Sequence, residues 1–379
     1  MMTETFDTII MGGGMAGLSL SIQLAEAGRR VMVLERNKFP FHRVCGEYVS
    51  MESWSFLERI GMPLSSMQLP AIKKLVVSSA KGKVLTHPLE PGGFGISRYL
   101  LDASLANIGR LRGAEIIEQC KVEDCEWRDG LFHVVAGGKK LTAKTVVGSF
   151  GKRSNMDKKL QRHLPGKTLF GESNWVGVKY HLTSDLPADV IHLHNFDGGY
   201  CGVSKVEGSV FCLCYLTRAA NLKKFDGQIS KMEEQILMKN PFLAKIFSNR
   251  SAFLFEEPVT ISQINFGSKL PVEKGILMAG DAAGLVAPLC GNGMSMALHA
   301  ASICFELLED YFKGRIKRAE LESLYAEKWN KHFAMRLMAG KILQPLLVNS
   351  VLSNPAIFLL KHFPMLMNKI VMATHGKSF

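Results

Sequence analysis

Apolar runs of strand and helix type alternate over the first 35 residues of the chain. Residues 6–11 form an apolar run that ends in glycines, and residues 15–27 repeat apolar side chains at helical spacing until Gly28 ends the pattern. Residues 31–35 then form a second apolar run. A strand, a glycine turn, a helix and a second strand predict two parallel strands, because parallel neighbours need a crossover connection.

Strand patterns and one well-capped helix follow over the next hundred residues. Residues 51–60 carry a helical pattern, and residues 72–89 predict two strands around a Lys-Gly turn. Ser97 is placed to cap a helix that runs to about residue 111, because its side chain accepts hydrogen bonds from free backbone N–H groups. Three short strands are expected within residues 115–136, and another strand follows them.

The pattern changes from strands to helices in the second half of the chain. Most segments between residues 174 and 266 alternate as strands do, with one helix expected at about 226–238. A buried strand then ends in Gly280 and Asp281. Helices are expected at 294–312 and 318–338, followed by a proline-broken apolar pair that reaches residue 372. We therefore expect strand-rich material inserted between two pieces of one sheet.

The composition indicates a large folded protein with a basic surface. The chain has 379 residues, of which 47% are hydrophobic and 21% charged, and its formal net charge is +12. This is enough apolar material for one large domain or two intertwined ones. A basic surface attracts nucleic acid, an anionic membrane or a cofactor that carries phosphates. The chain has no RNA- or DNA-binding motif, so we expect no nucleic-acid partner.

The cysteine pattern and the N-terminal residues favour a cytoplasmic protein without a bound metal. The eight cysteines form no Cys-x-x-Cys pair, which indicates free thiols and no structural zinc. The first ten residues lack the pattern of a secretory signal, and no window of about 18 apolar residues predicts a membrane span. His192 and His194 share one face of an expected strand, but no third ligand follows nearby.

A glycine turn and an acidic residue predict dinucleotide binding. Gly12, Gly14 and Gly17 occupy the positions of a Gly-x-Gly-x-x-Gly turn between the first strand and the first helix. The first glycine permits the tight turn, the second lets the backbone approach a pyrophosphate, and the third lets helix and strand pack closely. Glu35 ends the second strand, where an acid accepts hydrogen bonds from a ribose hydroxyl.

A second glycine-rich loop, residues 279–301, favours FAD over NAD. A minimal NAD-binding domain does not need this loop, whereas an extended FAD runs back across the sheet to reach one. The backbone N–H groups of residues 292–294 open the following helix, where they would stabilise negative charge on a reduced flavin.

Four segments of the chain resemble the flavoprotein superfamily of para-hydroxybenzoate hydroxylase and, more closely, the geranylgeranyl reductase family. They are the first glycine turn with Glu35, "FPFHRVCGEYVS" with Arg43, Cys45, Gly46 and Glu47, "GISRYLLDASL" with Arg98 and Asp102, and "AGDAAGLVAPLCGNGMSMAL". The resemblance covers nearly the whole chain. It implies an α/β fold in which an FAD-binding Rossmann-like domain of three layers (ββα) holds an inserted strand-rich substrate domain and C-terminal helices.

The resemblance also implies domain boundaries and FAD contacts. The FAD-binding domain is expected at 1–70, 98–170 and 267–312, the substrate domain at 71–97 and 171–266, and a helical section at 313–379. Asp281 is expected to hydrogen-bond the ribitol, and Pro288 to lie beside the isoalloxazine ring with the backbone of residues 291–294. The full set of expected contacts is Gly12, Gly14, Met15, Ala16, Gly17, Glu35, Arg36, Arg43, Cys45, Gly46, Arg98, Val122, Gly151, Gly280, Asp281, Pro288, Gly291, Asn292, Gly293 and Met294.

Two places depart from the family pattern. Phe150 stands where an Asp-Gly motif would have its aspartate, although Gly151 fits, and this weakens any inference about how NAD(P)H is engaged. The Tyr-x-Trp-x-Phe-Pro strand of the family's reductases keeps Tyr200, but Gly202 and Ser204 replace its bulky side chains. This difference argues against a geranylgeranyl substrate.

Three residues are candidates for a catalytic role: Cys45, Tyr200 and Cys290. The two cysteines fall in expected flavin-side loops, where a thiol would tune the flavin, donate a proton or simply fill space. His299 follows one turn into the next helix, and a packed histidine is the favoured interpretation.

Residues 342–372 are strongly apolar, with Lys361, His362 and Lys369 interspersed. Their apolar segments are too short and interrupted to span a bilayer. We favour packed helices over the substrate cavity, and the alternative is peripheral docking on the inner, anionic face of a membrane. Either arrangement suits a hydrophobic substrate.

These features together predict an FAD-dependent oxidoreductase with a hydrophobic small-molecule substrate and NAD(P)H as electron donor. The altered strand at Tyr200 favours a flavin monooxygenase that acts on an aromatic or polyketide-like compound. The Arg-x-Cys-Gly-Glu segment favours the alternative, a reductase that saturates isoprenoid double bonds. A third hypothesis, a flavin-holding carrier without turnover, rests on Phe150 alone. The cofactor carries the chemistry in each enzyme, so the residues do not separate them.

Overall fold

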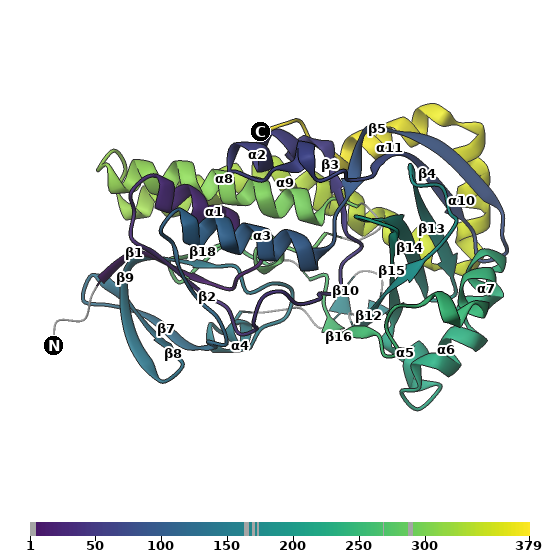
Figure 1. Cartoon of the computed structure of the whole chain (residues 1–379), viewed down its shortest axis with the longest axis horizontal. Helices are drawn as coiled ribbons and strands as arrows, with labels where there is room; N and C mark the ends of the chain where they lie inside the picture. Colours follow the sequence, from purple (N-terminus) through teal and green to yellow (C-terminus); the bar gives the residue numbers. More distant parts are fainter. Residues whose placement is uncertain (1–4, 163–166, 169–170, 173, 268, 287–290) are drawn as a thin grey trace.

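The computed structural model describes residues 5–162, 167–168, 171–172, 174–267, 269–286 and 291–379 (Figure 1). Figure 1 shows the strands gathered in two large sheets, with long helices along one side of the first sheet. The α/β class expected from the sequence is confirmed. The domain boundaries stay a prediction.

The first sheet has the order β17 (Val272–Glu273), β18 (Ile276–Met278), β9 (Lys139–Gly148), β1 (Thr5–Met11), β2 (Val31–Leu34) and β6 (Glu115–Ile117). From β18 to β6 all neighbours run parallel, as the strand–turn–helix–strand pattern predicts. Strand β18, which precedes the second glycine-rich loop, pairs with β9, and β9 pairs with β1, which precedes the first glycine turn. The strands before both glycine motifs therefore belong to one sheet.

Helices cover one face of the first sheet and a strand pair covers the other. The helices are α1 (Met15–Glu26), α3 (Arg98–Leu111) and α8 (Gly293–Phe312), and the strands are β7 (Val122–Arg128) and β8 (Leu131–Ala136). Figure 1 shows these two layers on opposite sides of β1 and β9. Ser97 caps α3 as predicted, with its Oγ accepting from the Leu100 N–H at 3.1 Å.

The second sheet has the order β16 (Val259–Ile264), β12 (Trp175–Thr183), β15 (Val210–Arg218), β14 (Gly199–Lys205), β13 (Val190–Phe196), β4 (Ala71–Ser78), β5 (Val84–Gly95) and β3 (Tyr48–Ser50). All neighbours are antiparallel except β13 and β4. The two faces of β12 differ. Val178 and Tyr180 join a core with the short helices of residues 219–248, whereas Lys179 and His181 face the other side.

The helix expected at 226–238 is present as α6 (Ile229–Gln235), but the expectation of a single helix is wrong. Two further short helices lie on either side of it, α5 (Ala219–Lys223) and α7 (Pro241–Ser248). Asn240 begins α7 because its Oδ1 accepts from the Phe242 N–H at 2.9 Å, and Pro241 follows in the first helical turn. Their buried side chains, such as Met232 and Phe247, cover β12 and β15.

The C-terminal helices are α9 (Arg318–Val348), α10 (Ser350–His362) and α11 (Pro364–Thr374). The expectation that α9 ends near residue 338 is wrong, since it continues past Pro345. Pro345 lies in the last turn, where it removes one helical hydrogen bond only. The end of the helix is held by the second sheet, because the Gly198 N–H donates to the Val348 carbonyl at 3.2 Å.

Smaller elements complete the described chain. They are α2 (Trp54–Arg59), α4 (Asn155–Lys159), and the paired short strands β10 (Lys167–Thr168) and β11 (Gly171–Glu172).

Candidate functional site

The turn between β1 and α1 is shaped for close backbone approach. Gly12 has a φ of +110°, and a Cβ there would overlap the Ser149 carbonyl. A Cβ at Gly17 would overlap the carbonyl oxygen of Gly12. Gly14 differs, because the nearest atom to its Cβ position is Arg98 Nη2 at 3.8 Å. The first and third glycines are therefore required by packing, whereas Gly14 borders open space beside a guanidinium.

The N-terminus of α1 is free to bind an anion. Its cap is Gly14, no side chain caps it, and its first turn holds no acid. The N–H groups of Met15 and Ala16 belong to the first turn, where helices leave N–H groups without an intrahelical partner. This arrangement, with Arg98 alongside, fits the pyrophosphate of a dinucleotide.

Glu35 is 3% exposed and fixes the turn from the end of β2. Its Oε2 accepts from the Gly13 N–H at 2.9 Å and from Arg43 Nη2 at 3.0 Å, and its Oε1 accepts from the Asn37 N–H at 3.0 Å. Arg36 follows it at the exposed surface. Glu35 thus lies where the sequence predicts a ribose contact, and it also orients Arg43.

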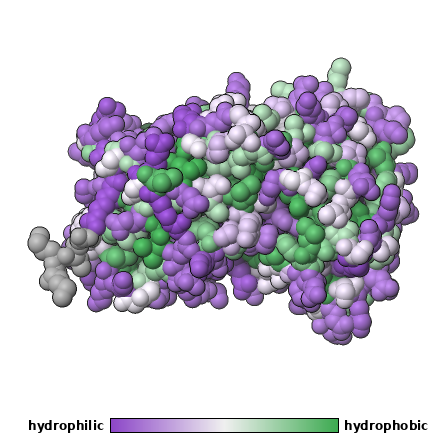
Figure 2. Space-filling model, viewed as in Figure 1, coloured by the Kyte–Doolittle hydropathy of each residue, from purple (hydrophilic) through white to green (hydrophobic). Residues whose placement is uncertain are grey.

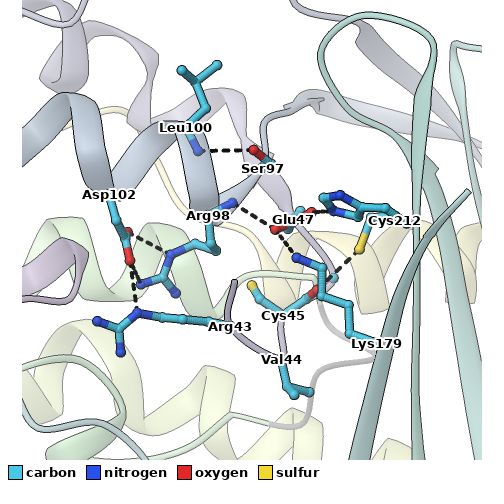
Figure 3. A network of polar contacts seen from close by, with 12 residues as sticks. Arg43, Val44, Cys45, Glu47, Ser97, Arg98, Leu100, Asp102, Lys179 and Cys212 are labelled. Atoms are coloured by element: carbon cyan, nitrogen blue, oxygen red, sulfur yellow. Dashed lines mark hydrogen bonds and ion pairs between the residues drawn. The ribbon is translucent and has the colours of Figure 1, made fainter. Parts of the chain in front are cut away.

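Arg43 and Arg98 converge on one buried carboxylate (Figure 3). Asp102 accepts from Arg43 Nε at 3.0 Å and from Arg98 Nη2 at 2.7 Å. Burial disfavours the charged Arg98, but the Asp102 carboxylate outweighs it and raises the pKa of Arg98. Two guanidinium groups are therefore held in place beside the glycine turn, which suits phosphate binding.

The second glycine loop lies against the first one. Gly280 has a φ of +64°, and its Cβ position lies 3.5 Å from Ala16 in α1 and 3.4 Å from Ala297 in α8. Asp281, which follows it, is partly exposed. The two motifs that lie more than 260 residues apart in the sequence thus form one site.

The start of α8 has features that fit a flavin ring. Asn292 is its N-cap residue without a side-chain cap, and Gly293 and Met294 form its first turn. The Nδ2 of Asn292 donates to the Thr374 carbonyl, while its buried Oδ1 has no hydrogen-bond partner among the described residues. An acceptor and free N–H groups at one helix start suit a ring that presents both N–H groups and carbonyl oxygens.

Cys45 lies beside this helix start, in the segment that crosses between the two sheets. Its Sγ is 3.4 Å from Met294 Sδ, and its carbonyl accepts from the Cys212 thiol at 3.3 Å. The Gly46 carbonyl accepts from Ser204 Oγ at 3.3 Å. The Arg-x-Cys-Gly-Glu segment is thereby fixed to β14 and β15 of the second sheet.

Glu47 carries a buried charge network that the sequence reasoning missed (Figure 3). Its carboxylate binds Lys179 Nζ, His181 Nε2 at 2.6 Å and the Arg98 N–H at 2.7 Å. Burial opposes its ionisation, but the hydrogen bond from His181 and the charge of Lys179 outweigh it and lower the pKa of Glu47 to about 2. A signal was present, because Lys179 and His181 alternate with apolar residues in a buried strand.

Other predicted residues are not gathered at this point. Tyr200 is buried in an apolar cluster with Trp175, Phe266 and Leu285. Val122 begins β7, near Glu35, whose carbonyl accepts from the Cys120 N–H at 2.9 Å. Gly151 has a φ of +78° in the loop after β9, and Gly291 has a φ of +64°. Pro288 and Cys290 lie outside the described residues.

The two strand histidines face away from the site. His194 bonds Ser78 at 2.8 Å and stacks on Phe242 of α7, and burial lowers its pKa to about 3. Within the described ranges, the one group with metal-ligating atoms close together is Glu47, His181 and Cys212. The ammonium group of Lys179 already neutralises Glu47 there.

Comparisons with known proteins agree on a flavoprotein. The FAD binding domain family matches residues 5–196. The chain is 23% identical to digeranylgeranylglycerophospholipid reductase 2 of Methanothermobacter thermautotrophicus, over 88% of this chain and 85% of that protein. It is 24% identical to menaquinone reductase of Mycobacterium tuberculosis, over 88% and 82%.

Solved structures share the whole fold. The p-nitrophenol 4-monooxygenase PnpA of Pseudomonas putida has a TM-score of 0.77 at 16% identity and covers 98% of this chain and 97% of its own. A geranylgeranyl bacteriochlorophyll reductase-like protein of Thermoplasma acidophilum has a TM-score of 0.75 at 16% identity, over 94% and 92%. A protein named as a monooxygenase and one named as reductase-like thus share this architecture, so the fold does not choose between the two reactions.

Proposed function

Because the chain belongs to the FAD binding domain family and is an FAD-dependent oxidoreductase, we propose that it acts as a monooxygenase on a hydrophobic small molecule. The residues that would hold FAD are the glycine turn, Glu35, Arg43 and Arg98 for its ADP part, and the two ends of the second loop for its flavin part. When bound, the flavin supplies two-electron redox chemistry. We propose NAD(P)H as the electron donor.

The apolar substrate class is supported by the sheet face next to the second loop. Trp175, Tyr200, Leu216, Phe266 and Leu285 form one apolar cluster there. These side chains are buried against one another, and they give this side of the site an apolar wall of the kind that lines ligand pockets.

Gly202 keeps the strand low beside this cluster, where the reductases of the family have a bulky side chain. Its Cβ position lies in ordinary van der Waals contact with Leu193 Cδ2 at 3.6 Å, and Gly202 pairs with Cys214 of β15.

The ionised state of Glu47 removes one proton donor that a reductase would need. Saturation of an alkene needs a proton donor as well as a hydride, and Glu47 is the buried carboxyl beside Cys45. With a pKa of about 2 it is ionised at neutral pH and holds no proton to give. Glu47 therefore gives no support to alkene saturation, and monooxygenation stays the first candidate.

A reductase is the second candidate, and the position of Cys45 favours it. The thiol lies 3.4 Å from Met294 Sδ at the start of α8, where it is placed to deliver a proton. The relatives named digeranylgeranylglycerophospholipid reductase and menaquinone reductase also support this candidate.

Isotope labelling separates the two reactions. The FAD-loaded protein is reduced anaerobically with NADH or NADPH and then mixed with alkylated phenols or polyprenyl lipids, under nitrogen or under ¹⁸O₂. We expect one ¹⁸O atom in a phenolic product and no product under nitrogen. Addition of two hydrogen atoms to a polyprenyl lipid under nitrogen, abolished in Cys45→Ala, would establish the reductase instead. Absence of flavin reduction by either nicotinamide would favour the carrier without turnover.

A further inference from the structure

The C-terminal helices expose an unusual share of the molecule's apolar side chains. Of the 19 large hydrophobic residues exposed in the described chain, 12 fall between residues 335 and 372. We call this set the C-terminal apolar surface: Met335, Met338, Ile342, Leu346, Val351, Leu352, Phe358, Leu359, Phe363, Met365, Leu366 and Met372. Figure 2 shows green, apolar residues at the surface at the end of the molecule where α10 and α11 lie in Figure 1.

The opposite side of the same helices is packed on the protein. Ile357 of α10 and Met367 and Val371 of α11 are buried in one cluster with Leu75 of β4 and Leu85 of β5. One apolar side of α10 and α11 therefore packs on the second sheet, and another apolar side of the same helices faces outward. An amphipathic helix of a protein that stays in water turns polar residues outward instead.

The charged residues around the C-terminal apolar surface are basic. After Glu327 the chain contains no further Asp or Glu, whereas it contains seven Lys and Arg residues. Lys361 and Lys369 are exposed between the apolar residues of α10 and α11. Arg336 is the exception, because its guanidinium is buried against Glu52. Apolar side chains with basic residues among them are complementary to an anionic lipid surface.

We propose that the C-terminal apolar surface docks the protein on an anionic bilayer, with α10 and α11 lying in the headgroup region. No single helix among the described residues is long and apolar enough to cross a membrane. The consecutive helices α9 and α10 pass that test only together, and they bend by 114° at their junction. A helix pair bent this sharply suits a surface position.

The docking helices lead directly to the flavin-side loop. The carbonyl of Thr374, at the end of α11, accepts the hydrogen bond from Asn292 at the start of α8, and His375 Nε2 lies 3.4 Å from the Tyr48 hydroxyl. A docked protein would thus hold its candidate site close to the lipid phase. The proposal does not depend on which reaction the flavin performs.

Vesicle sedimentation tests the proposal. The FAD-loaded protein is mixed with vesicles of phosphatidylcholine alone or of phosphatidylcholine with phosphatidylglycerol, and bound protein is measured after centrifugation. We expect binding to the anionic vesicles that weakens with added salt. Lys361→Gln/Lys369→Gln should weaken it about 30-fold, since each basic residue near such a surface contributes about 1 kcal/mol.

An apolar variant and a matched control complete the test. Phe358→Ser/Met365→Ser/Met372→Ser changes three side chains that are 58%, 82% and 76% exposed, so the fold should persist while vesicle binding is lost. Lys139→Gln/Lys140→Gln, which changes two exposed residues at the start of β9, should bind as the wild type does. FAD content and far-UV circular dichroism establish that each variant is folded.

Two results would overturn docking on lipid. One is binding to anionic vesicles that neither C-terminal variant weakens, or no binding at all. The other is a dimer in lipid-free buffer that the triple serine variant converts to monomers, because a second copy would then cover the surface.

Discussion

At the residue scale, the most constrained group is Glu47. The carboxylate of Glu47 and the side chains of Lys179 and His181 are all buried. The backbone of Glu47 has a φ of +56°, a conformation that residues other than glycine rarely adopt. Charges removed from water in this way are tolerated only when they are paired and hydrogen-bonded. The network therefore fixes the segment that carries Cys45 between the two sheets.

Removal of one partner of the ion pair between Glu47 and Lys179 should destabilise the fold strongly. Glu47→Gln leaves the Lys179 ammonium buried without its counter-charge, which costs about 3–5 kcal/mol. Lys179→Met in the same background should recover much of that loss. Urea unfolding of both single variants and the double variant measures the coupling, and additive losses would contradict a direct pairing.

The same carboxylate predicts acid sensitivity. The pKa of Glu47 falls from its usual 4.5 to about 2 in the folded protein, so its ionised form contributes stability above pH 4.5. That contribution, roughly 3 kcal/mol, should be lost as the pH falls from 4.5 toward 2. The free energy of unfolding measured across this range tests it. The slope should be shallower in Glu47→Gln/Lys179→Met, and an unchanged slope would mean that other carboxylates dominate.

At the scale of elements, the β1–turn–α1 unit separates folding from cofactor binding. A Cβ at Gly17 would overlap a backbone oxygen, whereas one at Gly14 lies in ordinary contact with the tip of Arg98 at 3.8 Å and the Ser149 carbonyl oxygen at 3.9 Å. The sequence motif assigns the second glycine to the pyrophosphate and the third to helix–strand packing. The surroundings of Gly14 and Gly17 agree with these two roles.

Two alanine substitutions should therefore have different effects. Gly17→Ala should destabilise the apoprotein by about 1–3 kcal/mol, because the overlap forces α1 away from β1. Gly14→Ala should leave the unfolding temperature of the apoprotein close to that of the wild type and weaken FAD binding at least tenfold, since the methyl group occupies the phosphate cradle. Fluorescence titration with FAD and thermal denaturation distinguish them. Equal FAD affinity in Gly14→Ala would place the pyrophosphate elsewhere.

At the scale of the whole molecule, buried ion pairs join segments from opposite ends of the chain. Arg336 of α9 binds Glu52 at 3.0 Å, across 284 residues of sequence, and both side chains are buried. Burial raises the pKa of Glu52, and Arg336 partly offsets this. The pair ties the helices of the C-terminal apolar surface to the segment that follows Glu47.

Loss of this pair should loosen the C-terminal helices. Arg336→Met leaves Glu52 buried and unpaired, at a cost of about 3–5 kcal/mol. We expect faster proteolysis within residues 337–379 than in the wild type, read from fragment masses, because local opening becomes easier. Lys328→Met, which removes an exposed ion pair of the same helix, is the control and should be cleaved at the wild-type rate.

Local order along the chain determined much of the fold and of the cofactor assignment. Gly17, Glu35 and the Ser97 cap act on neighbours a few residues away or on the turn before the first helix, so their pattern predicted the parallel sheet and the dinucleotide turn. The second loop predicted FAD for the same reason. Periodicity also placed most strands within a few residues of their bounds in the structure.

Tertiary structure alone decided which residues far apart in the sequence pair with one another and which side chains are exposed. Lys179 and His181 meet Glu47 across more than 130 residues, so no local pattern sets the charge state of the site. The helix α9 continues past Pro345 to Val348, whose carbonyl accepts a hydrogen bond from the Gly198 N–H of the second sheet. The apolar sequence of α10 and α11 fits burial or exposure equally, and only packing on β4 and β5 decides which side faces outward. Local propensity depends on near neighbours, whereas pairing and exposure depend on topology.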